Sequence, residues 1–133
     1  MGKEDIRLVG RIDREIYRCI ETDIATDEVI ITDERIAHIN EKHPGDYEVI
    51  APFISEALTC PDYIIKDDHH EGTCIVLKHI QSGEINFQIV LRLQTSTGTA
   101  GFKNSVLSAW RISKRRWENY LKNKTILYRQ QAD

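Results

Sequence analysis

The chain has 133 residues, of which 41% are hydrophobic and 29% charged, and this balance suits a single compact soluble domain. No apolar run approaches the roughly 20 residues that a helix needs to span a bilayer, and residues 1–5 lack the apolar segment of a secretory signal, so we expect a cytoplasmic protein with no membrane partner. The three cysteines, Cys19, Cys60 and Cys74, are odd in number and widely spaced, which argues against a disulfide framework.

The formal net charge of −3 is unevenly distributed. Residues 1–72 carry 18 acidic and 8 basic side chains, whereas residues 103–129 carry 8 basic side chains and one acidic residue, Glu118. The basic segment is either a surface that attracts a polyanion or the solvated side of a helix. The sequence does not decide between these two interpretations.

The first half of the chain predicts helices. Residues 7–20 form either a strand followed by a helix or one irregular segment. Residues 33–43 predict a helix, with Thr32 or Asp33 as its N-cap and Pro44 discouraging its continuation. Residues 46–58 predict a second helix, in which Pro52 is tolerated only near the first turns or as a kink.

The second half predicts strands. The β-branched and aromatic runs and the turns between them indicate strands at residues 63–65, 73–80, 85–93 and 105–112, a loop at 95–101, a basic helix at 114–122 and an edge strand at 125–129. Helices followed by strands predict an α+β domain, with the N-terminal helices packed on one face of a twisted antiparallel sheet of about four strands and a short C-terminal helix.

Strand alternation predicts which side chains face away from those helices. Placing Phe87, Ile89 and Leu91 in the core puts Arg92 on the open face. Placing Ile75 and Leu77 in the core puts Cys74, Val76 and Lys78 on the open face. We therefore expect Lys78 and Arg92 to share one sheet surface.

His43 is the titratable residue whose position is most informative. Rotation by about 100° per helical residue places Ile36, Ile39 and His43 on one stripe, with His38 pointing away. The carbonyls at the helix end favour the protonated imidazole, whereas burial favours the neutral form. His43 is either a proton-transfer group or a half-buried structural histidine, and His38 is the alternative proton carrier.

Metal and nucleotide-phosphate sites are not predicted. Residues 67–70 (Asp-Asp-His-His), Cys74 and His79 contain zinc-binding residue types, but the chain lacks a two-cysteine knuckle and a helical two-histidine pair. The glycines at 98 and 101 are not followed by the Gly-Lys-Ser/Thr ending of a phosphate loop. We expect neither a metal nor a cofactor.

Short motifs follow one another in a defined order: I-T-D-x-R-I-x-H-I-x-x-K-H-P at 31–44, P-D-Y-I at 61–64, L-K at 77–78, L-R-L at 91–93 and N-S-V-L-S-A-W at 104–110. In this order they resemble the phage-associated branch of the barnase, EndoU, colicin and RelE-like (BECR) nuclease superfamily, over about residues 29–129. The resemblance implies helices preceding a curved four-stranded antiparallel sheet and a metal-independent ribonuclease, often a toxin. It implies a catalytic set of His43, Lys78, Arg92 and Ser108. We further expect substrate contacts from His38, Asn104 and Trp110.

Cleavage of RNA by attack of the 2′-hydroxyl on the adjacent phosphate needs a proton acceptor, a proton donor and cations, which such a set can supply. We therefore expect His43, Lys78 and Arg92 to converge around one phosphate. RNA, tRNA included, is the expected partner, together with an acidic inhibitor or immunity protein that covers Lys78 and Arg92. The alternatives are a non-catalytic RNA-binding or protein-interaction module and a purely structural phage or toxin-partner domain. Trp110, Trp117 and Tyr120 either stack on bases or belong to the core.

Overall fold

A computed structural model describes residues 5–98 and 101–131 of the chain. The expected loop at 95–101 lies partly outside the described residues, and residues 1–4, where we expect no signal segment, lie outside them. Within the described ranges, no helix is both long and apolar enough to cross a membrane.

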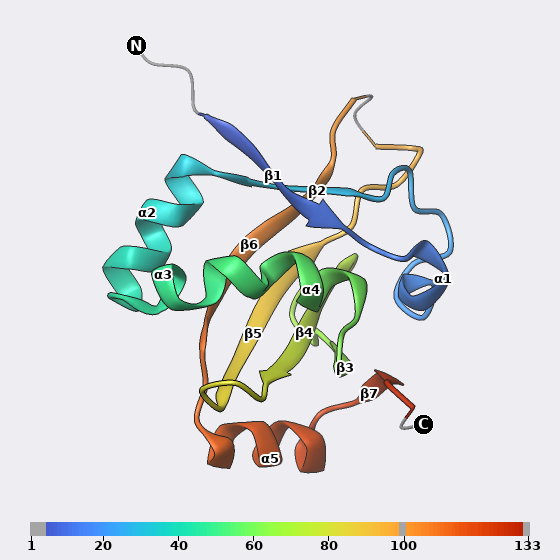
Figure 1. Ribbon diagram of the computed structural model, residues 1–133. Coiled ribbons are helices and arrows are strands. Elements are labelled where there is room, and N and C mark those ends of the chain that lie inside the picture. Colours follow the sequence, from blue (N-terminus) through green and yellow to red (C-terminus); the bar gives the residue numbers. More distant parts are fainter. Residues whose placement is uncertain (1–4, 99–100, 132–133) are drawn as a thin grey trace.

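Helices and strands are interspersed along the chain (Figure 1). The strands are β1 (Ile6–Arg11), β2 (Glu28–Thr32), β3 (Tyr63–Lys66), β4 (Thr73–Ile80), β5 (Ile85–Arg92), β6 (Asn104–Arg111) and β7 (Ile126–Arg129). The helices are α1 (Arg14–Tyr17), α2 (Asp33–Lys42), α3 (Asp46–Ile50), α4 (Ile54–Thr59) and α5 (Lys114–Asn123), with a 3-10 turn at Ala51–Phe53.

The seven strands of the described residues form one sheet in the order β1-β2-β6-β5-β4-β3-β7, antiparallel except for the parallel pair β2 and β6. The predicted α+β class and C-terminal helix are confirmed. The prediction of about four strands is wrong, because β1 and β2 extend the sheet on one side and β7 on the other. The sequence did not predict β2 because this short apolar run passes into α2 with no turn residue between them.

The two predicted N-terminal helices form differently. Helix α2 begins as expected, since the Thr32 hydroxyl accepts a hydrogen bond from Arg35 N–H at 3.2 Å. The predicted helix at 46–58 is instead α3, a 3-10 turn and α4. Pro52 lies in that turn, and because proline has no N–H to donate, the regular α-helical hydrogen bonding is interrupted there.

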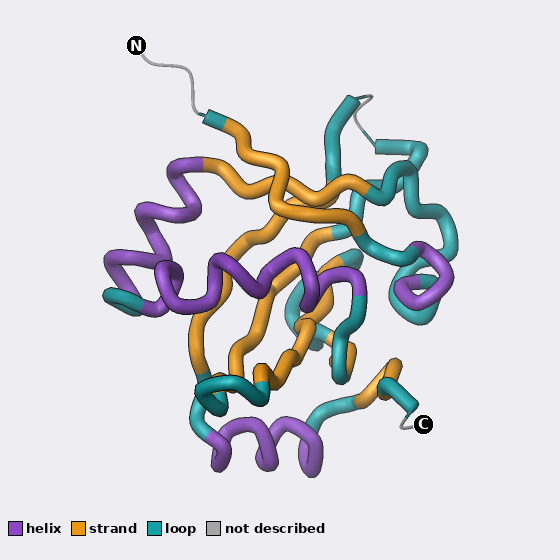
Figure 2. The backbone as a smooth tube through the Cα atoms, in the orientation of Figure 1, coloured by secondary structure: helices purple, strands orange, loops and turns teal. Residues whose placement is uncertain are grey.

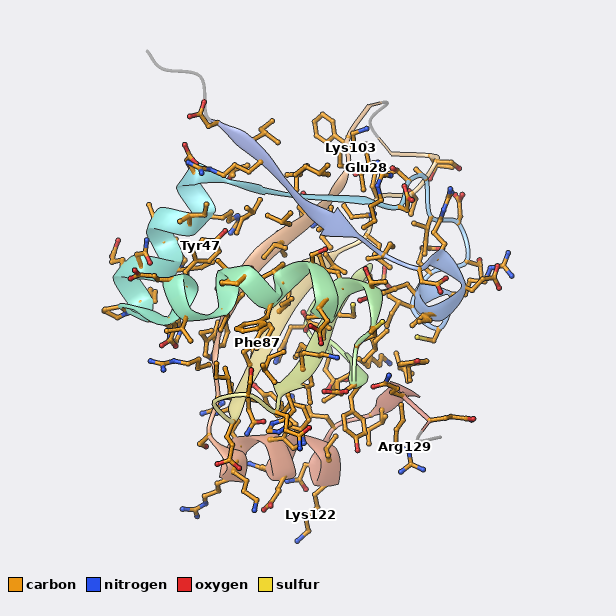
Figure 3. The ribbon with its side chains drawn as sticks, in the orientation of Figure 1. Glu28, Tyr47, Phe87, Lys103, Lys122 and Arg129 are labelled. Atoms are coloured by element: carbon orange, nitrogen blue, oxygen red, sulfur yellow. The ribbon has the colours of Figure 1, made fainter. Side chains whose placement is uncertain are left out.

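Side chains reinforce the short parallel pairing of β2 with β6. The buried Asn104 amide donates to the carbonyls of Thr26 (2.7 Å) and Glu28 (3.0 Å), and its Oδ1 accepts from Gln94 N–H at 2.7 Å. Lys103 lies beside Glu28 (Figure 3), with 2.5 Å between Nζ and Oε1, and it lowers the pKa of that carboxyl. The contacts of Asn104 and Lys103 with Thr26 and Glu28 connect segments more than 70 residues apart in the chain.

Apolar clusters lie on both faces of the sheet. Helices α2, α3 and α4 cover one face (Figure 2), where the main core contains Ile39, Ile54 and Phe87. A smaller cluster on the opposite face joins Leu77 and Ile65 to Trp117, Tyr120 and Leu121 of α5. We call this second face the α5 face.

The predicted alternation holds for β5 but is inverted for β4. Cys74 and Val76 belong to the main core, whereas Ile75 and Leu77 belong to the cluster under α5. The inversion was not visible in the sequence because residues 74–77 are all apolar, so either alternation could face a core. Cys74 is fully buried, and that burial raises the pKa of its thiol.

Candidate functional site

His43 lies at the C-terminal end of α2. Its backbone N–H donates to Ile39 O at 2.7 Å, and its imidazole stacks on Trp110 of β6, with ring centroids 4.5 Å apart and planes 7° apart. Ile39 is fully buried and His43 half-buried, whereas His38 is exposed, as the helical spacing predicts. The imidazole is therefore held flat against an indole at the edge of the sheet.

Asp46 fixes the turn that carries His43. Gly45 adopts a left-handed φ of +84°, which favours glycine, and the next N–H, that of Asp46, donates to His43 O at 3.1 Å. The Asp46 carboxylate accepts hydrogen bonds from Arg111 N–H (3.0 Å) and Arg111 Nε (2.8 Å). Strand β2 pairs only with the start of β6, so the far end of β6 has no strand of the described residues beside it on that edge. The turn after α2 binds there, at Arg111, one residue beyond Trp110.

A row of side chains continues from His43 across the α5 face. Trp110 pairs in register with Gln88 of β5, and the Tyr120 hydroxyl of α5 donates to Gln88 Oε1 at 2.8 Å. Gln88 is only 2% exposed, and the Arg116 guanidinium lies 6.0 Å from the centre of the Tyr120 ring. We call His43, Trp110, Gln88 and Tyr120 the His43–Tyr120 row. It contains two side chains that can exchange protons, an imidazole and a phenol.

Ser108 and Arg92 share the α5 face with this row. Ser108 pairs with Val90, which follows Gln88 on the same face of β5, and Arg92 is the next residue along that face. Four residues of strand separate Gln88 from Arg92, or about 14 Å. Arg92 is exposed and forms no ion pair with any residue that the structure describes.

Lys78 is on the other face. It pairs in register with Phe87, so its side chain extends on the main-core side, where it is 6% exposed. Its Nζ donates to Cys60 O at 2.8 Å and lies 3.5 Å from Glu56 Oε2 and 3.8 Å from Asp62 Oδ1. These contacts join β4 to the end of α4 and the start of β3.

The prediction that Lys78 and Arg92 share a sheet surface is therefore wrong, and so is the expected convergence of both cations with His43. The error follows from the inverted alternation of β4. His43, Ser108, Trp110 and Arg92 are the predicted site residues that the structure brings to one face.

The two remaining predicted site residues lie elsewhere. Asn104 is fully buried, and its amide group is occupied by the backbone of Thr26, Glu28 and Gln94. His38 is exposed on α2, on the side away from Ile39.

No group of three or more histidine, cysteine, aspartate or glutamate side chains in residues 5–98 and 101–131 is arranged to hold a metal ion. In the loop after β3, His70 Nδ1 lies 3.5 Å from Asp67 Oδ2. Cys74 and His79 are on opposite faces of β4, as their alternation predicts.

Two parts of this site were not predicted from the sequence. The first is the hydrogen bond between Tyr120 and Gln88, for which the signal was a single amide among the apolar residues 87–91. The second is the contact of Asp46 with Arg111, which no local pattern indicates because 65 residues separate the partners.

Comparison with known proteins gives one match. The model of the phage-Barnase-EndoU-ColicinE5/D-RelE like nuclease 2 family matches residues 4–129, which is nearly the whole chain. No curated protein and no solved structure is similar enough to match.

Proposed function

The chain belongs to the phage-Barnase-EndoU-ColicinE5/D-RelE like nuclease 2 family, and from that premise we propose that it is a metal-independent endoribonuclease acting at the His43–Tyr120 row. The observation that carries the proposal is the imidazole stacked on Trp110 at 4.5 Å, on the face where Tyr120 contacts Gln88. A nuclease that works by acid and base catalysis needs two proton carriers, and the imidazole and the phenol of this row are the candidates that we propose.

The proposed reaction uses the ribose 2′-hydroxyl as the nucleophile. His43 accepts the 2′-hydroxyl proton as the oxygen attacks phosphorus, and the bond to the 5′-oxygen breaks. The Tyr120 O–H donates a proton to that departing oxygen, which leaves a 2′,3′-cyclic phosphate on one fragment and a 5′-hydroxyl on the other. DNA lacks the nucleophile, so the proposal is specific to RNA.

Cations and an aromatic ring would position the chain of nucleotides. Arg116, whose guanidinium lies 6.0 Å from the centre of the Tyr120 ring, would bind a phosphate beside the row. Arg92 lies about 14 Å from Gln88 along β5 and would bind a different phosphate of the same RNA. Ser108, which pairs with Val90 between these two positions, would donate a hydrogen bond to the RNA. Trp110, which is partly exposed, would stack on a base beside His43.

Cleavage of total RNA and purified tRNA in EDTA tests the proposal. We expect wild-type protein to produce 2′,3′-cyclic phosphate ends and the His43→Ala variant to lose at least about a hundredfold in rate. His69→Ala, which removes an exposed histidine from the loop after β3, is the matched control and should cleave normally. A 2′-deoxy substrate should stay intact.

Two results would contradict this assignment. Equal cleavage by wild type and His43→Ala would remove His43 from the mechanism, and loss in His38→Ala alone would transfer the role to the other histidine. Salt-sensitive binding of RNA that remains intact would instead identify a non-catalytic RNA-binding module, the alternative that the basic α5 supports.

A toxin role brings a further expectation about partners. An acidic inhibitor protein would cover Arg92 and the exposed basic residues of α5, because these charges are accessible. It would not contact Lys78, which is 6% exposed. Co-purification of an acidic protein from the native host by wild type, but not by an Arg92→Glu variant, would support this arrangement, and equal recovery by both proteins would contradict it.

A further inference from the structure

A cavity of about 1120 Å³ opens between α5, the β4–β5 hairpin and the start of β3. It is separate from the His43–Tyr120 row, none of whose residues lines it. The cavity has the volume of a small-molecule site. The residues that line the cavity indicate which class of ligand it would bind.

Three rings form walls of the cavity. Trp117 of α5 lies edge-on to Tyr63, with centroids 5.9 Å apart and planes at 80°, and to His79, with centroids 6.5 Å apart and planes at 74°. His79 is fixed by a 2.6 Å hydrogen bond between its Nδ1 and Asn86 Oδ1. Aromatic rings that line a cavity at steep angles to one another are the kind of surface that attracts organic cations.

Carboxylates complete the lining. Glu84 and Glu118 border the cavity, and neither forms an ion pair with any residue in the described part of the chain. Asp62 adds a third carboxylate, although it also accepts a hydrogen bond from His79 N–H at 2.7 Å. Among the described residues, Lys114 is the one lysine or arginine of this lining, and Lys78, outside it, lies 3.8 Å from Asp62 Oδ1, so Glu84 and Glu118 are the carboxylates without an ion-pair partner. The local charge therefore favours a cation and opposes a phosphate.

The acidic character of this cavity contrasts with its surroundings. Glu118 is the single acidic residue in the basic segment 103–129, and its side of α5 borders the cavity. Trp117, next to it in sequence, supplies an aromatic wall, and Leu121, one turn later, adds an apolar surface. An alkyl chain bearing ammonium groups matches this combination of rings, apolar surface and separated carboxylates.

We propose that this cavity binds a polyamine, with its alkyl chain against Trp117 and Leu121 and its ammonium groups at Glu84 and Glu118. The inference goes beyond the proposed nuclease activity and does not depend on it, because binding requires no RNA and no reaction at His43.

Calorimetric titration of the full chain with spermidine at constant ionic strength tests the proposal. We expect saturable binding that the double variant Glu84→Gln/Glu118→Gln weakens by about tenfold or more. The matched control is Glu34→Gln/Glu48→Gln, which removes the same charge from two exposed glutamates outside the cavity and should bind normally. Trp117→Leu should also weaken binding, with the fold of each variant checked by circular dichroism.

Three outcomes would overturn the proposal. The first is an affinity of the protein for spermidine that is no higher than its affinity for sodium ions at the same ionic strength. The second is an equal loss in both glutamate pairs, which would indicate only a general charge effect. The third is binding of a nucleoside monophosphate in preference to spermidine, which would make the cavity a nucleobase site. The glutamates are exposed, so these variants remain informative even if Trp117→Leu fails to fold.

Discussion

At the scale of single residues, the placement of His43 on Trp110 depends on one carboxylate, that of Asp46. It binds both the backbone and the guanidinium of Arg111, and it is 14% exposed, so it is a positioning residue for the imidazole. Its removal frees the turn that follows α2. The histidine itself remains, with its chemistry intact but its position no longer fixed.

We expect Asp46→Ala to lower kcat for RNA cleavage by about 10- to 100-fold, since displacement of a catalytic group by about 1 Å costs that much. KM and the pH dependence of kcat should change little, because the same groups bind RNA and titrate. Asp33→Ala is the control: it removes a partly exposed aspartate at the start of α2 whose Oδ1 lies 2.8 Å from Arg7 Nε. Comparable losses in both variants would refute a specific role for Asp46.

Lys78 is a second residue whose position differs from its sequence-based expectation. In Lys78→Met the donor to Cys60 O is lost and two carboxylates lose a cation, so we expect a loss of about 1–3 kcal/mol in the free energy of unfolding. Cleavage per folded molecule should persist. Lys66→Met, at an exposed position in β3, provides the comparison in urea titrations and should change stability by no more than about 0.5 kcal/mol. A loss of cleavage without a loss of stability would restore Lys78 to the catalytic set.

At the scale of elements, the sequence predicted those parts that local chemistry determines. Thr32 caps α2 and the apolar alternation of β5 fixes its core face, because each depends on residues a few positions apart. The parity of β4 could not be predicted, since both of its faces are buried. Neither could the contact of His43 with Trp110, because the turn at Asp46 reaches Arg111 across 65 residues.

Asn104 is the side chain on which the β2–β6 pairing most depends. Asn104→Ala leaves a backbone N–H and two carbonyls without their partner, so we expect a loss of about 2–4 kcal/mol in the free energy of unfolding. Asn40→Ala, at an exposed position in α2, should be almost neutral in the same denaturation experiment. A near-neutral Asn104→Ala would show that the strand pairing does not need this amide, and unchanged stability with lost RNA binding would instead support its predicted substrate contact.

At the scale of the whole molecule, the uneven charge predicts where a polyanion binds. Lys122 and Arg129, at the basic end of the chain, are labelled in Figure 3 on the same side of the molecule, and both are exposed. The acidic residues are concentrated in the first 72 positions. RNA should therefore approach from α5 despite the net charge of −3.

This expectation can be measured in a His43→Ala background, where RNA stays intact. Arg115→Glu/Lys122→Glu should weaken RNA binding and reduce the slope of log affinity against log salt by about 2, since each removed phosphate contact contributes about 1. The control variant, Arg18→Glu/Lys66→Glu, introduces the same charge change at exposed positions outside the basic segment 103–129. Equal slopes for the two double variants would show that only net charge matters.

The residues of the His43–Tyr120 row are far apart in the sequence. This separation determines when, during synthesis of the chain, the row can first form. A ribosome completes α2 early and α5 near the end, so a growing polypeptide can contain the imidazole and the indole while Gln88 still lacks its phenol partner. Translation must pass residue 120 before the row is complete. If the proposed assignment holds, a nascent chain lacks its catalytic pair while it remains close to the RNA of the machinery that makes it.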